Sequence, residues 1–210
     1  TAHQKKGNHK VTDFYKKINE NFNSYYKDTW EECEKGNKAK KDIVGTRYEK
    51  FKEDWVKSYP HLDVATPAEI SKIKKDLGGT FNADIYIVDK KTRKLLALEE
   101  DKGHYVDKCF LKRALMNAVD TIIASSKNNK TPPKFILSSP TSYAKVSEIL
   151  DSLSEPLKKK HYNSLKNSFI YAPLCQHGRV QRNKYLKSSE NPFKLDEDLC
   201  YNQHRFYMNL

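Results

Sequence analysis

Two short apolar segments joined by a charged turn constrain the fold of this chain most strongly. Residues 81–88 end in a run of β-branched and aromatic side chains, residues 94–100 are rich in leucine, and the polar stretch from Asp89 to Lys94 connects them. A short polar turn between two such segments is typical of an antiparallel β-hairpin. Because the central positions of both segments are apolar, we expect the hairpin to belong to a buried sheet.

Apolar residues repeat at three- and four-residue intervals on both sides of the hairpin, which indicates helices. Helices are expected over residues 11–30, 43–59, 66–77, 106–125 and 143–153. The third should begin at Thr66 as its N-cap, with Pro67 at the first helical position. Two further strands are expected over residues 134–137 and 169–174.

No internal repeat or linker divides these elements, so we predict one α/β domain over residues 1–210. It should contain a central mixed β-sheet flanked by helices, with its core at about residues 43–175. Residues 1–10 are expected to form a flexible basic arm. The segment 176–210 is expected to be polar, basic and irregular.

The charge of the chain favours a polyanionic partner. There are 39 Lys and Arg residues against 27 Asp and Glu residues, a formal net charge of +12, and such an excess is most often associated with nucleic acid. No apolar run of about 18 residues and no signal-peptide pattern occurs, so we expect a cytoplasmic protein of bacterial, archaeal or viral origin with no membrane partner.

The four cysteines are widely spaced, with no CxxC pair, and are expected to be reduced and mostly buried. They are Cys33, Cys109, Cys175 and Cys200. A zinc site that combines the last two with His177 and His204 is the alternative, but this spacing is a poor match to structural zinc motifs.

Charged residues with possible chemistry gather at one end of the hairpin. Asp84 lies early in the first strand, and Glu100 and Lys102 end the second. Side chains two residues apart share a face of a strand, so Glu100 and Lys102 should point the same way and Asp101 the opposite way. The position of the turn places Asp84 across from Glu99 or Glu100.

Two neighbouring carboxylates suit Mg²⁺, which prefers oxygen ligands and can neutralise the charge on a phosphodiester during hydrolysis. A nearby ammonium group can orient the attacking water and stabilise the transition state. The alternative for these residues is a charged hairpin end that contains only a surface salt bridge.

This arrangement resembles the PD-(D/E)xK nuclease superfamily, the fold of many type II restriction endonucleases. In that family the second strand of the hairpin ends in (D/E)-x-K, as Glu100-Asp101-Lys102 does here, and Ala83 stands where the family has Pro. A helix with an acidic residue commonly precedes the hairpin, and Glu49 after Gly45 matches it.

The resemblance implies a role for each of these residues. Asp84 and Glu100 would be metal ligands together with the backbone carbonyl of Asp101, Lys102 would position the attacking water, and Glu49 would be an auxiliary acid. It also implies Mg²⁺ as the cofactor, with Mn²⁺ as a substitute, and a homodimer that acts on symmetric sites in double-stranded DNA.

Basic and amide side chains near the site and toward the C-terminus are the expected DNA contacts. They are Lys108, Lys112, Arg113, Arg179, Gln181, Arg182 and Lys184. A solvated basic loop is the alternative for the last four. We therefore expect a Mg²⁺-dependent hydrolase, an endodeoxyribonuclease of the type II restriction class. The alternatives are a homing or repair endonuclease or a junction resolvase of the same fold, and a non-catalytic, basic nucleic-acid-binding module.

Overall fold

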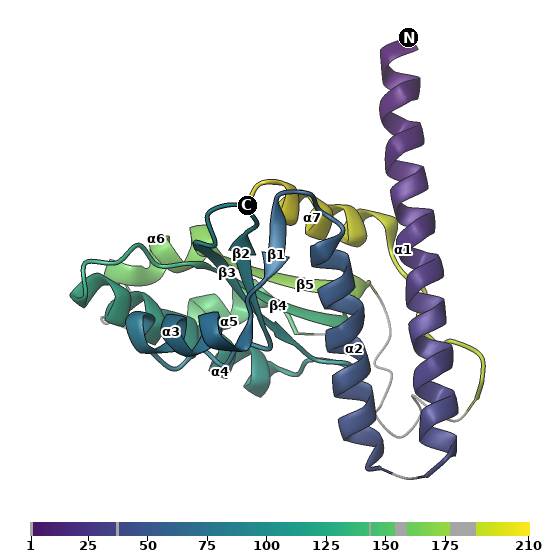
Figure 1. Cartoon of the computed structure of the whole chain (residues 1–210), viewed down its shortest axis with the longest axis horizontal. Helices are drawn as coiled ribbons and strands as arrows, with labels where there is room; N and C mark the ends of the chain where they lie inside the picture. Colours follow the sequence, from purple (N-terminus) through teal and green to yellow (C-terminus); the bar gives the residue numbers. More distant parts are fainter. Residues whose placement is uncertain (1, 37, 143, 154–158, 177–187) are drawn as a thin grey trace.

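A five-stranded mixed sheet forms the centre of the molecule (Figure 1). The computed structural model describes residues 2–36, 38–142, 144–153, 159–176 and 188–210. In spatial order the strands are β1 (Leu62–Val64), β2 (Ile85–Asp89), β3 (Leu95–Asp101), β4 (Lys134–Thr141) and β5 (Phe169–Cys175). The first three strands pair antiparallel, and β3, β4 and β5 pair parallel.

Helices cover both faces of this sheet. On one side, called here the α2 face, lie α1 (Ala2–Glu34), α2 (Lys40–Lys57) and α7 (Glu197–Met208). On the other side, the α4 face, lie α3 (Pro67–Leu77), α4 (Lys108–Lys127), α5 (Val146–Ser152) and α6 (Lys159–Ser168). The prediction of one α/β domain with a mixed sheet flanked by helices is thereby confirmed.

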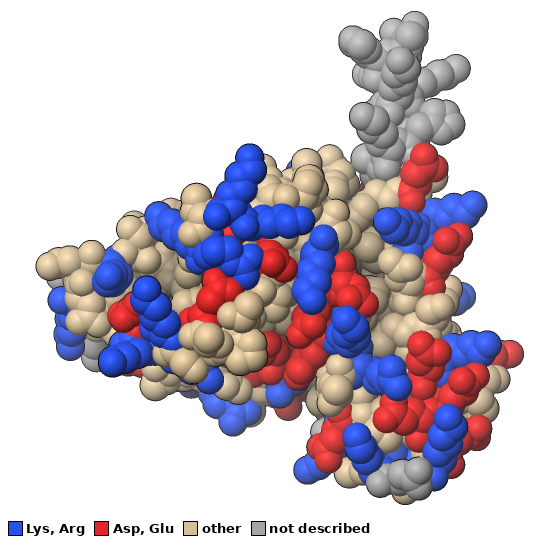
Figure 2. All heavy atoms as spheres, viewed as in Figure 1, with Lys and Arg blue, Asp and Glu red and all other residues tan. Residues whose placement is uncertain are grey.

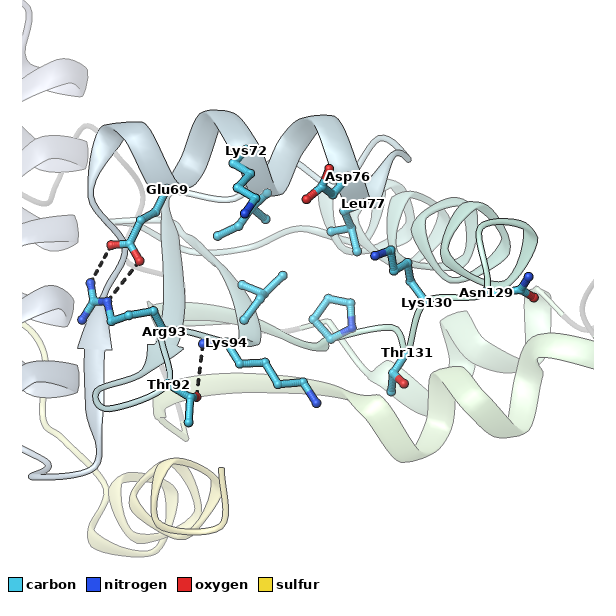
Figure 3. A pocket seen from close by; sticks show the side chains of 13 residues that line it. Glu69, Lys72, Asp76, Leu77, Thr92, Arg93, Lys94, Asn129, Lys130 and Thr131 are labelled. Carbon is cyan, nitrogen blue, oxygen red and sulfur yellow. Dashed lines mark hydrogen bonds and ion pairs between the residues drawn. The ribbon is translucent and has the colours of Figure 1, made fainter.

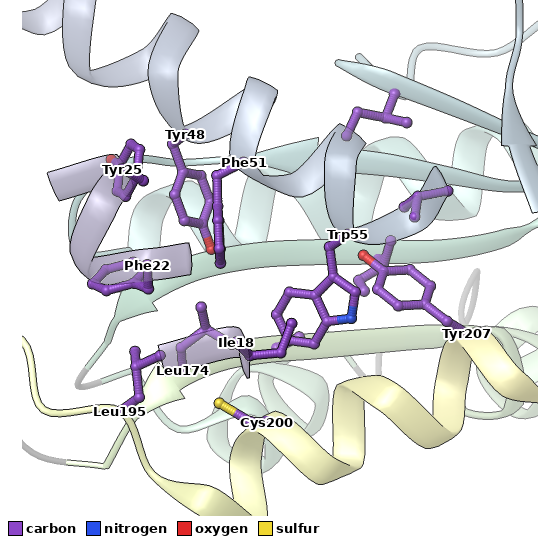
Figure 4. Packing of buried hydrophobic residues seen from close by; sticks show 14 of the residues in the cluster. Ile18, Phe22, Tyr25, Tyr48, Phe51, Trp55, Leu174, Leu195, Cys200 and Tyr207 are labelled. Atoms are coloured by element: carbon purple, nitrogen blue, oxygen red, sulfur yellow. The ribbon is translucent and has the colours of Figure 1, made fainter. Parts of the chain in front are cut away.

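The core of the α2 face contains many aromatic side chains (Figure 4). The rings of Tyr25 and Phe51 stack with centroids 5.6 Å apart, and Phe22 meets Phe51 edge-on at 5.4 Å. Full burial of one such side chain contributes roughly 1.5–3 kcal/mol. These rings therefore fasten α1 to α2, and α2 to the sheet.

The local signals at the start of α3 are confirmed. Thr66 is the N-cap, its side chain accepts a hydrogen bond from the Glu69 amide at 3.3 Å, and the Glu69 carboxylate accepts one from the Thr66 amide at 3.1 Å. This reciprocal pair satisfies two amides that the first turn of a helix leaves unpaired.

The two ends of the chain differ from the expectation. Residues 2–10 are helical and continue α1 back to Ala2, where a loose arm was expected. Among the described residues of the C-terminal part, 188–210, the segment from Glu197 to Met208 is also not irregular, because it forms α7 and buries Cys200, Gln203 and Tyr207 against the sheet. Their spacing is helical, but Gln203 in the middle of this stripe made it look polar.

The cysteines are free, as expected. Those of α1, β5 and α7 are buried, and Cys109 at the start of α4 is exposed. The proposed zinc partner His177 lies outside the described residues. Within the described ranges, no helix combines the length and the apolar composition needed to cross a bilayer.

Candidate active site

The candidate site is built where β3 ends beside the start of β2. The Asp84 amide donates to the Glu99 carbonyl at 2.8 Å, and the Asp101 amide donates to Asp84 Oδ2 at 2.7 Å. Ile85 pairs with Glu99, so Asp84 stands opposite Glu100, one of the two residues that the position of the turn predicted. The backbone of one strand thus orients a carboxylate that precedes the other.

Side chains alternate along the end of β3, and this separates Glu99 from Glu100. The Glu99 carboxylate accepts a hydrogen bond from the Tyr207 hydroxyl of α7, so Glu99 lies on the α2 face. Lys102 Nζ lies 4.4 Å from the centroid of the Phe110 ring of α4, and Glu100 interacts with Lys102 and Asp84. Glu100 is therefore the carboxylate that shares the site with Asp84.

Glu49 of α2 completes a group of three carboxyl groups. It is half-buried and hydrogen-bonds to Asp84. Burial, and next the negative charge of Asp84, raise the pKa of Glu49 to about 7. In its protonated form Glu49 can donate this hydrogen bond to Asp84, and the bond opposes the rise of the Asp84 pKa.

Burial also dominates the electrostatics of the two central carboxylates. It raises the pKa of Glu100 to about 7, with Lys102 opposing the rise and Asp84 adding to it. Burial raises the pKa of Asp84 as well, and the amide of Asp101 followed by Lys102 lowers it. The site therefore gathers more negative charge than its ammonium group balances, which favours either bound protons or a cation.

The donor set fits a hard divalent cation such as Mg²⁺. Among the described residues, no group of three or more His, Cys, Asp and Glu side chains has the arrangement of a metal site. Mg²⁺ needs fewer protein ligands, because it keeps several of its water molecules and uses one or two carboxylates. Asp84 and Glu100 would supply these, and the Asp101 carbonyl is adjacent in the chain.

The structure describes three of the seven residues expected to contact DNA, all of them on α4. On α4, Lys112 and Arg113 are exposed, and Arg113 lies 5.2 Å from the centroid of the Phe110 ring on which Lys102 also sits. Lys108 forms an ion pair with Glu148 at 3.2 Å. The C-terminal set lies outside the described residues: Arg179, Gln181, Arg182 and Lys184.

Charges of both signs are interspersed on the face drawn in Figure 2. Lys and Arg side chains lie beside Asp and Glu side chains over α2, α3 and the hairpin in that view. The described residues therefore form no surface of positive charge alone on this face.

A cavity of about 630 Å³ lies away from the site, between α3, the β2–β3 turn and the segment before β4 (Figure 3). At its edge Arg93 donates to Glu69 at 2.6 Å and to Asp63 at 2.7 Å. The lining carries four basic side chains against two carboxylates, so the cavity lacks the excess of carboxylates of the candidate site: Lys72, Arg93, Lys94 and Lys130 against Glu69 and Asp76.

Sequence reasoning missed a set of buried polar residues on the α2 face. Lys52 and Glu99 have no exposed surface, and Gln203 donates to the Tyr207 hydroxyl at 3.3 Å. The available signal was Lys52 itself, which interrupts the apolar stripe of α2 between Tyr48 and Val56.

Comparison with family models, with curated proteins and with solved structures gives no match. Function therefore has to be inferred from the geometry of the site.

Proposed function

We propose that this chain is a Mg²⁺-dependent endodeoxyribonuclease of the PD-(D/E)xK type that hydrolyses phosphodiester bonds in double-stranded DNA at a specific site. The observation that supports it is that Asp84, Glu100 and Lys102 lie together where β3 ends beside β2, with Glu49 reaching Asp84 from α2. These are the four positions that match the family motif.

The roles of the chain's own residues follow from this geometry. Asp84 and Glu100 would hold Mg²⁺, which supplies Lewis-acid stabilisation of the charge that develops on the phosphate. Lys102, held over Phe110 at 4.4 Å, would orient the water that attacks phosphorus and would stabilise the developing oxyanion. Glu49 would act as an auxiliary acid next to Asp84.

The substrate would approach along the start of α4. Lys112 and Arg113 are exposed there and would contact phosphates, because ammonium and guanidinium groups pair with phosphate oxygens. The proposal further includes a homodimer acting in the cytoplasm, as in a restriction system, because a two-fold symmetric protein matches a symmetric DNA site.

Cleavage of a supercoiled plasmid tests the proposed function. We expect nicked and linear products with Mg²⁺ or Mn²⁺, none with EDTA, and none for Asp84→Asn. Asp76→Asn is the matched control, since Asp76 is an exposed carboxylate on α3. Cutting without a divalent cation, or full activity of D84N, would contradict the mechanism.

Substrate geometry separates the related functions. Preferential cleavage of branched over linear duplex DNA would indicate a junction resolvase of the same fold. Salt-sensitive DNA binding that Mg²⁺ does not change, without nicking of any substrate, would indicate a non-catalytic binding module.

A further inference from the structure

A charged cluster is buried directly behind the candidate site, on the α2 face of β3. It consists of Lys52 from α2, Glu99 and Asp101 from β3, and Tyr207 from α7; we call it the inner cluster. Lys52 and Glu99 are fully buried and Asp101 is 4% exposed. Lys52 Nζ lies 4.2 Å from the Trp55 ring centroid and 4.9 Å from that of Tyr207, two rings labelled in Figure 4.

The inner cluster is under-satisfied in hydrogen bonds. Within the described part of the chain, Lys52 Nζ makes no hydrogen bond, and no N–H or hydroxyl group donates to the Asp101 carboxylate or to Glu99 Oε2. The carboxyl groups of Asp101 and Glu99 can bond only to each other, when one of them is protonated. The other oxygen of Glu99 accepts from the Tyr207 hydroxyl. Burying charged groups in this way costs more free energy than burying apolar side chains of the same volume. The cluster therefore adds little to stability, and a role in specifying geometry explains it better.

Lys52 is the counter-charge of this cluster. Burial lowers the pKa of Lys52, and Glu99 followed by Asp101 opposes the fall. The pKa of Asp101 rises well above its ordinary value through burial and then through Glu99, while Lys52 opposes that rise. The ammonium group of α2 thus attracts both carboxyl groups toward the interior.

Two contacts connect the inner cluster to the candidate site. The Asp101 side chain is buried on the same side of β3 as Lys52, which attracts it without a direct hydrogen bond, while the Asp101 amide donates to Asp84 Oδ2 at 2.7 Å. Glu49, which hydrogen-bonds to Asp84, precedes Lys52 on α2 by about one helical turn. One helix therefore reaches Asp84 directly through Glu49 and indirectly through Lys52 and Asp101.

We propose that Lys52 is a positioning residue of the candidate nuclease site. By attracting the buried carboxyl groups of Glu99 and Asp101, it draws the end of β3 against α2. This fixes the Asp101 amide that orients Asp84 and keeps Glu100 and Lys102 on the α4 face. That the site is a nuclease site rests on the proposed function, whereas the positioning of Asp84 by Lys52 is independent of it.

Hydrogen–deuterium exchange of the full chain tests this positioning without reference to cleavage. In Lys52→Met we expect the amides of residues 99–103 to exchange roughly tenfold faster or more, with β4 and α4 unchanged. Lys50→Met is the matched control on the same helix, because Lys50 is exposed and pairs with Asp54 at 3.0 Å. Unchanged exchange at residues 99–103 in K52M would overturn the proposal.

A second variant covers the case in which K52M does not fold. Lys52→Met combined with Glu99→Gln and Asp101→Asn leaves a neutral cluster of similar volume, which should restore folding. If Lys52 positions Asp101, residues 99–103 still exchange faster in this triple variant. Exchange equal to the wild type would mean that Lys52 only balances charge, and would overturn the proposal.

The kinetic readout distinguishes the two proposals. If the wild-type chain cleaves DNA, K52M should lower kcat with KM little changed, because phosphate contacts on α4 are intact. If the wild type cleaves and K52M changes neither kcat nor exchange, only the role of Lys52 is overturned. If the wild type does not cleave but K52M loosens residues 99–103, the nuclease function falls and the positioning of Asp84 stands.

Discussion

The backbone amide of Asp101 donates a hydrogen bond to the carboxylate of Asp84 at 2.7 Å. A main-chain donor orients a side chain far more rigidly than a second side chain does, because it has no rotamers of its own. Asp84 is thereby aimed at Glu100 before any ligand arrives. A site organised in this way should be sensitive to changes of charge at Asp84 and Glu100, and also to changes that move the end of β3.

Glu100→Gln and Glu99→Gln should have different effects, although the residues are adjacent. Glu100 belongs to the site with Asp84, so E100Q should weaken Mg²⁺ binding and lower cleavage by roughly hundredfold or more. E99Q keeps an oxygen that can accept from Tyr207, so its metal affinity should remain within a few-fold of the wild type. Calorimetric titration with Mg²⁺ measures both. Loss of binding in E99Q alone would reverse the assignment.

Gly103 and Gly45 should respond oppositely to substitution by alanine. A Cβ on Gly103 would lie 2.6 Å from Val44 Cγ1 and 2.7 Å from the Val44 carbonyl, whereas one on Gly45 would have nothing within 4 Å. Gly103→Ala should therefore cost about 1–3 kcal/mol and push α2 away from the site. Gly45→Ala, inside α2, should gain about 0.5–1 kcal/mol. Urea denaturation of the two variants provides the comparison, and a neutral G103A would contradict the close packing.

Tyr207→Phe should destabilise the fold although it removes one oxygen atom. Tyr207 is fully buried and its hydroxyl donates to Glu99, so the phenyl ring leaves a buried acceptor without its donor. The expected loss is about 1–3 kcal/mol in the free energy of unfolding. Tyr201→Phe, at a partly exposed position on the same helix, should be nearly neutral. Equal stability of Y207F and Y201F would show that the C-terminal helix is not a structural part of the core.

Arg93→Gln should lower stability at neutral pH and lose its effect in acid. Hydrogen bonds from Arg93 lower the pKa of Asp63 and, with the Thr66 amide, lower that of Glu69 to about 2. Because the folded-state pKa values lie below the unfolded ones, this stabilisation is complete above about pH 4.5 and disappears toward pH 2. Melting curves should differ by a few degrees at pH 7 and converge as the pH falls.

Lys94→Gln is the control for this pH dependence. Lys94 is exposed and follows Arg93 in the chain, and its substitution by Gln removes the same charge. A difference between R93Q and wild type that persists unchanged at pH 2 would mean that packing, and not ion pairing, explains it.

Lys112→Ala should weaken DNA binding equally on all sequences. If Lys112 contacts a phosphate, the slope of log K against log salt should decrease in magnitude by about one. Lys127→Ala, at the far end of α4, removes the same charge and should leave the slope unchanged. Fluorescence anisotropy over a series of salt concentrations measures both slopes, and equal slopes would remove α4 from the DNA interface.

Local signals explain which parts could be predicted from the sequence. The hairpin and the start of α3 depend on residues close together in the chain, so their turn and capping patterns were readable. The three-residue strand β1 was too short to show a pattern, and α7 was hidden by Gln203 in its buried stripe. Lys52 could not be placed, because its partners Glu99 and Tyr207 are distant in sequence and a buried lysine looks like a surface one.

The alternation of side chains along the end of β3, from Glu99 to Lys102, has a consequence for how the chain folds. Because successive side chains face opposite sides, shifting β3 by one residue against its neighbours would exchange all four. Glu100 and Lys102 would then face Tyr207 on the α2 face, and Glu99 and Asp101 would face α4. Such a chain would lose its core and its site in the same step. A molecule that folds with the correct core therefore also has a correctly assembled site, because the same register of β3 determines both.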